Sequence, residues 1–199
     1  MKKTLSTLAL LISFVSFGQT ANEYLDSGYA KAKAKDHSGA ISDYAKAIEL
    51  NPNKADAYYN RGISKYNLKE YNGAISDYTK AIELDPSHAD AYYSRGFAKN
   101  DLNDYNRAIS DYTKAIELSP NQAEAYYNRG LSKYNLKEYN GSIADYTKAI
   151  ELDPNYAEAY YNRAISKYYT NDLKGACEDA RKSGSLGNPF PKMEVAACN

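Results

Sequence analysis

Residues 55–88 read ADAYYNRGISKYNLKEYNGAISDYTKAIELDPSH, and residues 123–156 read AEAYYNRGLSKYNLKEYNGSIADYTKAIELDPNY. The two stretches are identical at 28 of 34 positions, which excludes chance similarity. The proline near the end of the unit recurs every 34 residues, at Pro52, Pro86, Pro120 and Pro154. The chain therefore contains an internal repeat. Its units are 21–54, 55–88, 89–122, 123–156 and 157–184, the last of which is incomplete.

Each unit has the residue spacing of two helices. Counted from position 1 at Ala55, the apolar and aromatic residues recur in steps of three and four, the period of one helix face. Residues 67–70 interrupt this spacing and predict a turn. Pro86 predicts the end of the second helix, because proline lacks an amide hydrogen and restricts the residue before it. We therefore predict a helix, a short turn and an antiparallel helix in every unit.

Small residues occupy two positions where helices are expected to approach closely. At position 8 they are Gly28, Gly62, Gly96, Gly130 and Ala164, and at position 20 they are Ala40, Ala74, Ala108, Ser142 and Ala176. A larger side chain at either position would push the helix axes apart. A single helix pair leaves one face exposed, so each unit is expected to be stable only when it is stacked on its neighbours.

The unit length and these residues resemble the tetratricopeptide repeat over about 160 residues. The resemblance rests on the aromatic residue at position 4, the small residues at positions 8, 20 and 27, the aromatic residues at positions 17 and 24, and the proline at position 32. It implies an all-α fold, a right-handed α-solenoid of about five helix-turn-helix repeats. Residues 19–184 are expected to form this array.

Two positions depart from the pattern of that family. Position 7, usually apolar, is arginine in four units, and position 11, usually aromatic or apolar, is lysine in all five. An arginine at a packing position needs a partner, because an unpaired buried charge is unfavourable. Aspartate at position 23 offers one, so we predict a ladder of Arg–Asp pairs that maintains the stacking geometry. The sequence leaves open whether each arginine pairs within its own unit or with the preceding one, and Ser27 replaces the first arginine. Ligand contact by the arginines is the less favoured alternative.

In the tetratricopeptide family, positions 2, 5, 6, 9 and 12 line a concave groove that holds extended peptides or helices of partner proteins. The resemblance therefore implies that the corresponding residues of this chain bind a partner. The predicted groove residues are Tyr59, Asn60, Ile63, Tyr66, Asp90, Tyr93, Phe97, Glu124, Tyr127, Asn128, Leu131, Tyr134, Glu158, Tyr161 and Asn162. Tyrosine offers rigid contact area, and asparagine both donates to and accepts from a peptide backbone. The alternative for any single tyrosine or asparagine is that it only lines an open groove and packs against a neighbouring helix.

The acidic residues at position 2 favour a neutral or basic protein or peptide as partner. The carboxylate clamp of chaperone-binding family members needs lysine, asparagine and arginine along this row, so capture of an acidic tail is not expected. Two alternatives remain. Aromatic rings with amides and carboxylates also suit carbohydrate, and near-identical units could self-associate into longer structural arrays.

The composition argues against nucleic acid as a partner. The 199 residues include 25 Lys+Arg and 25 Asp+Glu, a formal net charge of +0, whereas binding to phosphate backbones requires a surplus of positive charge. The only histidines, His37 and His88, lie in different units without a cysteine or carboxylate at the spacing of a metal site. No phosphate-binding or nucleophile motif appears. We therefore predict a non-catalytic protein without a metal or cofactor.

Residues 1–18 read MKKTLSTLALLISFVSFG and have the parts of a secretory signal peptide. Two lysines precede an apolar run over residues 5–15, and residues 16–18 have small side chains at their first and third places. The alternative is an apolar first helix of the fold. No cysteine lies near the cleavage point, so a lipid anchor is not expected, and no later stretch is apolar enough to span a membrane. The mature protein is expected to be exported, either to the periplasm or out of the cell.

Both cysteines lie near the C-terminal end. Cys177 takes position 21 of the fifth unit, where the other units have isoleucine, and Cys198 follows after a segment with several glycines and prolines. In an oxidising compartment we predict a Cys177–Cys198 disulfide. It would fasten a short capping helix, at residues 192–197 of the segment 185–199, over the end of the array. The alternative is two buried free thiols.

Overall fold

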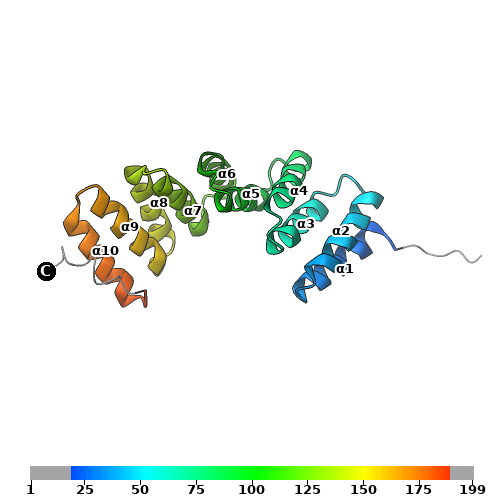
Figure 1. Ribbon diagram of the computed structural model, residues 1–199, viewed down its shortest axis with the longest axis horizontal. Helices are drawn as coiled ribbons and strands as arrows, with labels where there is room; N and C mark the ends of the chain where they lie inside the picture. Colours follow the sequence, from blue (N-terminus) through cyan, green and yellow to red (C-terminus); the bar gives the residue numbers. More distant parts are fainter. Residues whose placement is uncertain (1–18, 189–199) are drawn as a thin grey trace, which may run out of the picture.

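The computed structural model describes residues 19–188, which form ten α-helices and no strand. The helices are α1 (Ala21–Lys33), α2 (His37–Leu50), α3 (Ala55–Asn67), α4 (Tyr71–Leu84), α5 (Ala89–Asp101), α6 (Tyr105–Leu118), α7 (Ala123–Asn135), α8 (Tyr139–Leu152), α9 (Ala157–Tyr169) and α10 (Leu173–Ser185). They follow one another in chain order along the long axis of the molecule (Figure 1). The all-α prediction is confirmed.

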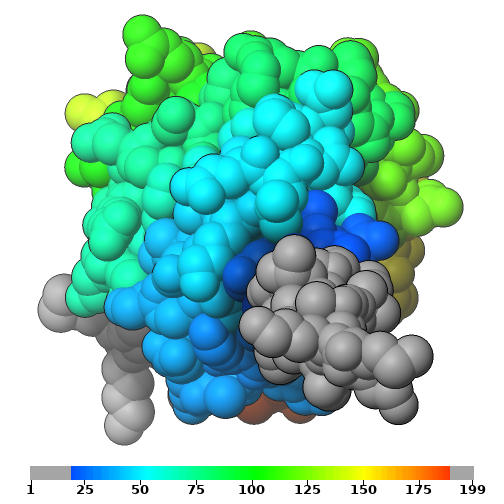
Figure 2. Space-filling model, turned by 90° about the vertical axis from the view of Figure 1, so that its right-hand side faces the viewer, coloured from blue at the N-terminus to red at the C-terminus, as the bar shows by residue number. Residues whose placement is uncertain are grey.

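The ten helices form five antiparallel pairs, and each pair stacks on the next. The first helix of a pair packs against its second helix, and the second helix also packs against the first helix of the following pair. In the view along the long axis, the second and third repeats, coloured cyan to green, lie above and beside the blue first repeat and are not in line behind it (Figure 2). The stack is therefore a winding solenoid, as predicted.

Three predictions concern residues outside the described range. The signal peptide at residues 1–18, the capping segment beyond residue 188 and Cys198 all lie there. Cys177 lies in α10 and is buried. Because Cys198 lies outside the described residues, the Cys177–Cys198 disulfide stays a prediction. Among the helices of residues 19–188, none has the length and apolar character needed to cross a membrane.

Two residues after the end of every first helix, at position 15, the turn has a residue with left-handed backbone conformation. These residues have φ values of 60 to 64°, at Lys35, Lys69, Asn103, Lys137 and Asn171. In the second repeat the amide of Glu70 donates to the carbonyl of Lys65 at 2.9 Å, and the amide of Lys69 donates to the carbonyl of Tyr66 at 2.8 Å. These bonds satisfy carbonyls that the helix end leaves open, so the turn offsets the unfavourable left-handed conformation of a lysine.

The two helices of a repeat meet where the glycine at position 8 faces the tyrosine at position 24. The tyrosines are Tyr44, Tyr78, Tyr112 and Tyr146, each at most 2% exposed. A Cβ atom added to Gly62 would lie 2.7 Å from the ring of Tyr78, so only glycine fits beneath the ring. In the fifth repeat the tyrosine is replaced by Ala180, and the glycine by Ala164. The predicted close approach is confirmed, and the two positions are complementary in size.

We expect Gly62→Ala to destabilise the protein although alanine is the better helix former. Overpacking against the buried Tyr78 ring costs about 1–3 kcal/mol, of which higher helix propensity offsets up to about 1 kcal/mol. Gly184→Ala in α10 is the matched control, because nothing lies within 4 Å of its added Cβ. Urea unfolding followed by circular dichroism should show a lower midpoint for Gly62→Ala and an equal or higher one for Gly184→Ala. Equal midpoints for Gly62→Ala and the unmodified chain would contradict the size constraint.

Candidate partner-binding face

The candidate site is the first-helix face, which we define as positions 2, 5, 6, 9 and 12 of α3, α5, α7 and α9. Its carboxylates are exposed, at Asp56, Asp90, Glu124 and Glu158. Most of its other side chains are half-buried, including the apolar residues at position 9, and Asn128 is buried at 8% exposure. The predicted groove residues are among the positions of this face, and its four carboxylates are exposed to solvent.

The tyrosines at position 5 pack against buried tyrosines of the core. The rings of Tyr59, Tyr93 and Tyr127 lie with their centroids 5.9, 5.7 and 5.8 Å from the buried tyrosine at position 24 of the same repeat. Two of these tyrosines are also bonded to the next repeat. Asn128 donates its side-chain amide to the hydroxyl of Tyr93, and Asn162 donates to the hydroxyl of Tyr127, both at 2.8 Å. These hydroxyls and amides therefore connect consecutive repeats, which agrees with the alternative that individual groove residues pack against neighbouring helices.

Aromatic contacts continue across the boundary between the second and third repeats. The ring of Phe97 lies 5.6 Å from that of Tyr66 in the preceding repeat and 6.2 Å from that of Tyr93, with which it is stacked. The hydroxyl of Tyr66 donates to the carboxylate of Asp101. The ring surfaces at positions 5, 9 and 12 thus form a continuous contact surface in this part of the array.

A residue that the sequence analysis did not assign to the site also lies on this face. Position 34, just before each first helix, is Lys54, His88, Gln122 or Tyr156. The ammonium of Lys54 donates to Asn22 at 2.7 Å, and the amide of Gln122 donates to Asp90 at 3.3 Å. The ring of His88 lies 4.6 Å from that of Tyr59, and the ring of Tyr156 lies 4.8 Å from that of Tyr127. Position 34 therefore contacts position 2 or position 5 of the repeat that it ends.

The predicted Arg–Asp ladder is confirmed, and each arginine pairs within its own repeat. Arg61 donates Nε and Nη2 to the two carboxylate oxygens of Asp77, at 2.9 and 2.6 Å. The ammonium of Lys65 lies 2.7 Å from the same carboxylate. Equivalent clusters are Arg95, Lys99 and Asp111; Arg129, Lys133 and Asp145; and Arg163, Lys167 and Asp179. The lysines at position 11 are thus partners of the buried aspartates, a role that the sequence analysis missed.

The arginines also bond to the preceding repeat. Arg95 donates Nη1 to the hydroxyl of Thr79 at 3.1 Å, and Arg129 and Arg163 make the same bond to Thr113 and Thr147. Each of the four guanidinium groups lies 5.5 to 5.6 Å from the ring of the tyrosine at position 4. In the third, fourth and fifth repeats the arginine therefore links the two helices of its own repeat to the second helix of the preceding one.

In the first repeat, which has no arginine at position 7, the buried Asp43 is paired with Ser27 and Lys31. Ser27 donates its hydroxyl to Asp43 at 2.6 Å, and the ammonium of Lys31 lies 2.6 Å from the same carboxylate oxygen. Burial raises the pKa of Asp43, but the hydrogen bonds from Lys31 and Ser27 and the positive charges of Lys31 and Lys46 together outweigh burial, so the pKa lies below its ordinary value. The aspartate that the sequence analysis left without an arginine is therefore ionised and paired.

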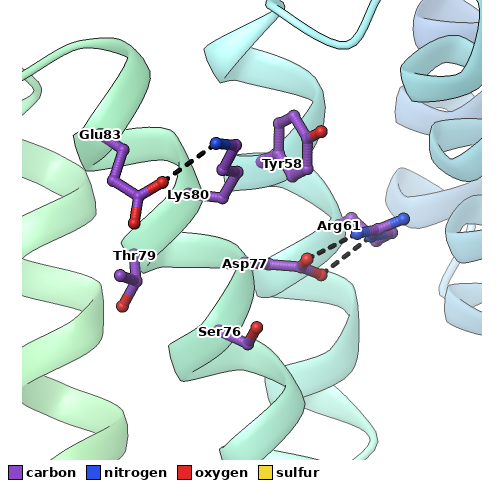
Figure 3. A pocket seen from close by; sticks show the side chains of 7 residues that line it. All are labelled: Tyr58, Arg61, Ser76, Asp77, Thr79, Lys80 and Glu83. Atoms are coloured by element: carbon purple, nitrogen blue, oxygen red, sulfur yellow. Dashed lines mark hydrogen bonds and ion pairs between the residues drawn. The ribbon is translucent and has the colours of Figure 1, made fainter.

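A pocket of about 390 Å³ lies between α3 and α4, beside the Arg61–Asp77 pair (Figure 3). It is lined by Tyr58, Arg61, Ser76, Asp77, Thr79, Lys80 and Glu83. Its charged groups pair with one another, because Lys80 also bonds to Glu83 at 3.0 Å. No residue of the first-helix face lines the pocket, and no group of three potential metal ligands occurs within residues 19–188. The first-helix face is therefore the stronger candidate for ligand binding.

We expect Asp111→Asn to be strongly destabilising, because it leaves Arg95 and Lys99 half-buried without a counter-charge. Breaking a buried ion pair lowers the free energy of unfolding by about 3–5 kcal/mol. Because Arg95 and Lys99 are both partly exposed, we expect a loss near the lower end of that range. The control is Glu117→Gln in the exposed Lys114–Glu117 pair of the same helix. Chemical unfolding should show a large loss for the first variant and almost none for the control. Equal stabilities would show that the cluster does not hold the repeat together.

Burial keeps many tyrosines of the array protonated. It raises the pKa above the ordinary 10.0 for Tyr44, Tyr59, Tyr66, Tyr78, Tyr93, Tyr112, Tyr127, Tyr146 and Tyr156. For Tyr44 the pKa rises to about 12. The hydroxyls of Tyr112 and Tyr146 have no hydrogen-bond partner among the described residues. The phenols beneath the first-helix face are therefore neutral over the whole physiological pH range.

These raised pKa values predict alkaline unfolding. In the unfolded chain the tyrosines lose their protons near pH 10, whereas in the folded chain they keep them, so the unfolded state binds fewer protons and gains stability as pH rises. The free energy of unfolding should be insensitive to this effect below about pH 9 and should fall steeply above about pH 10. Urea unfolding at a series of pH values, with tyrosinate absorbance as the second probe, measures it. Ionisation of all tyrosines near pH 10 without unfolding would contradict this prediction.

Sequence profiles of the tetratricopeptide repeat match most of the chain. They match residues 55–88 and 123–156, residues 28–69 and 98–137, and residues 77–110 and 145–178. Together the matches run without a gap from residue 28 to residue 178. The chain belongs to the tetratricopeptide repeat family. Among curated proteins no relative matches it.

Solved structures with the same fold include several tetratricopeptide proteins. A crystal structure of the MamA protein has a TM-score of 0.79 and 28% identity, over 83% of this chain and 91% of that chain. A MamA fragment from Desulfovibrio magneticus RS-1 has a TM-score of 0.80 and 24% identity, over 85% and 96% of the two chains. YrrB, described as a TPR protein with an unusual peptide-binding site, has a TM-score of 0.77 and 24% identity, over 89% and 91%. The fold of a protein-protein interaction module is thus shown.

Proposed function

We propose that this protein is a non-catalytic scaffold that binds an extended segment or a helix of a partner protein along its first-helix face. The observation that carries the proposal is the repetition of this face. Exposed carboxylates at position 2 and half-buried aromatic and aliphatic side chains at positions 5 and 9 recur in the first helices of the second to fifth repeats. A linear partner that contacts several repeats would meet the same kinds of group at regular intervals.

Two features of the face support a protein partner. Large aromatic side chains at a contact surface provide most of the binding energy of protein interfaces when a partner covers them. The carboxylates favour a neutral or basic segment by charge complementarity. YrrB, which shares the fold, is described as having a peptide-binding site, and we extend that mode of recognition to this chain as part of the proposal.

The carbohydrate alternative receives less support from the geometry. Sugar recognition needs hydroxyl and amide groups that are free to bond, whereas the hydroxyls of Tyr93 and Tyr127 are bonded to Asn128 and Asn162. We further propose that the scaffold acts after export, in the periplasm or outside the cell, on the basis of the signal-like residues 1–18.

Site-specific photo-crosslinking tests the proposed face. Benzoylphenylalanine replaces Phe97 in one variant of the full chain and Ser110 in the other, and each is irradiated with a random peptide library. Phe97 is itself aromatic and lies on the first-helix face, whereas Ser110 is exposed on α6 of the same repeat. We expect peptides to become attached at position 97 and not at position 110, as read by mass spectrometry.

The crosslinking experiment has two outcomes that would overturn the proposal. Equal attachment at both sites would mean that peptides collide with the surface without selecting a face. Attachment at position 97 of a second copy of the chain, with no peptide captured, would favour the self-associating array.

A further inference from the structure

The junction between the fourth and fifth repeats differs chemically from the other junctions on the first-helix face. Its rings belong to Tyr127 and Tyr156, whose centroids are 4.8 Å apart at an interplanar angle of 32°. Glu124 and Glu158 are exposed near these rings and have no hydrogen-bond or ion-pair partner within residues 19–188. Two aromatic rings and two free carboxylates therefore occur together only at this junction of the described array.

The repeat geometry places Glu124 beside Tyr156. These residues occupy positions 2 and 34 of one repeat. In the third repeat the same two positions are Asp90 and Gln122, which are hydrogen-bonded at 3.3 Å. Tyr156 has no side-chain amide, and no hydrogen bond joins it to Glu124 within residues 19–188, so the carboxylate of Glu124 lacks the partner that Asp90 has.

The second carboxylate approaches from the next repeat. Glu158 lies one helical turn before Asn162 on α9, and Asn162 donates to the hydroxyl of Tyr127 at 2.8 Å. The negative charges of Glu124 and Glu158 both contribute to raising the pKa of Tyr156, although burial is the larger cause. Glu124 belongs to the fourth repeat and Glu158 to the fifth, so each of the two repeats contributes one carboxylate to the surroundings of Tyr156.

We propose that Tyr127, Tyr156, Glu124 and Glu158 form a subsite for a cationic side chain, lysine or arginine, of the bound partner. This inference rests on the proposed function and adds the chemistry of the partner. A cation over an aromatic face is attracted by the ring quadrupole, and an adjacent carboxylate adds a direct charge interaction. The charge complementarity is local, because the cations at positions 7 and 11 of these repeats are already paired with buried aspartates.

The other junctions show why this subsite is single. At the first junction, position 34 is Lys54, which donates to the neutral Asn22, and Leu25 stands at position 5. At the third junction the side-chain amide of Gln122 donates a hydrogen bond to Asp90, so that carboxylate already has a partner. At the second junction the imidazole of His88 packs on Tyr59. The residue at position 34 thus decides what each junction offers to a ligand.

Two capped peptides serve as probes: one of alternating lysine and glycine, and one in which norleucine replaces lysine. Each is titrated into the full chain, with binding followed by the tyrosine ring signals in nuclear magnetic resonance. Tyr156→Phe and Tyr127→Phe assign the two rings. We expect the lysine peptide to shift both signals and to bind more tightly than the norleucine peptide. Equal affinity of the two peptides would overturn the inference, because a cation would then have no advantage.

Charge removal at the subsite is the second arm. The double variant Glu124→Gln and Glu158→Gln should weaken binding of the lysine peptide about tenfold, from the loss of two exposed charge interactions. The charge-matched control, Glu117→Gln and Glu151→Gln, removes two exposed acids from the second helices α6 and α8. It should leave the affinity unchanged. An equal loss in both double variants would mean non-specific attraction and would overturn the inference.

Exchanging residues between repeats is the third arm, and it preserves side chains that the fold already accepts. Tyr156→Gln introduces the residue of the third repeat and should abolish the preference for lysine. Gln122→Tyr should create a second lysine subsite between Tyr93, Asp90 and Glu124. Unchanged binding by Tyr156→Gln would overturn the role of the ring pair. If library peptides crosslink at position 97 while lysine gives no advantage, this inference fails and the proposed function stands.

Discussion

The contact between the glycine at position 8 and the tyrosine at position 24 sets the geometry of the array. Because the glycine has no side chain, the buried ring lies directly on the backbone of the first helix and fixes its distance from the second. The other contact of that ring supports the tyrosine at position 5, with centroids 5.7 to 5.9 Å apart. The position-5 tyrosines of the first-helix face are therefore continuous with the core, and their placement follows from the short distance between the two helices of a repeat.

The buried aspartate at position 23 provides a second constraint, which joins three helices through one carboxylate. In the third repeat, Asp111 on α6 holds Arg95 and Lys99 of α5, and Arg95 reaches Thr79 on α4. The charges are balanced inside a single repeat, while the bond between repeats has a neutral acceptor. Repeats of this kind can be stacked in any number without leaving a buried charge unpaired.

Helix spans, the close approach at position 8 and the Arg–Asp pairs could be predicted from the sequence, because each follows from a short-range period or from the need of a buried charge for a partner. The pairing of Lys65 could not, since a long lysine side chain serves equally well in solvent. Lysine also has no preference for the left-handed conformation of Lys69. The bond from Asn128 to Tyr93 depends on how one repeat is set on the next, which no local period encodes. Position 34 was overlooked because it lies between helices, although it differs between residues 55–88 and 123–156.

Those two stretches differ at only six positions, and three of the six are positions 2, 9 and 34 on or beside the first-helix face. The core glycine, the core tyrosine and the aspartate cluster leave little freedom elsewhere, since a change at any of them disturbs packing or leaves a charge unpaired. Chemical variety is therefore confined to places that the stack does not use. On the proposed function, a bound segment meets Lys54, His88, Gln122 and Tyr156 in turn, each presented by the same scaffold. Selectivity would then arise from the order of these residues, because the backbone geometry of the repeats is alike throughout.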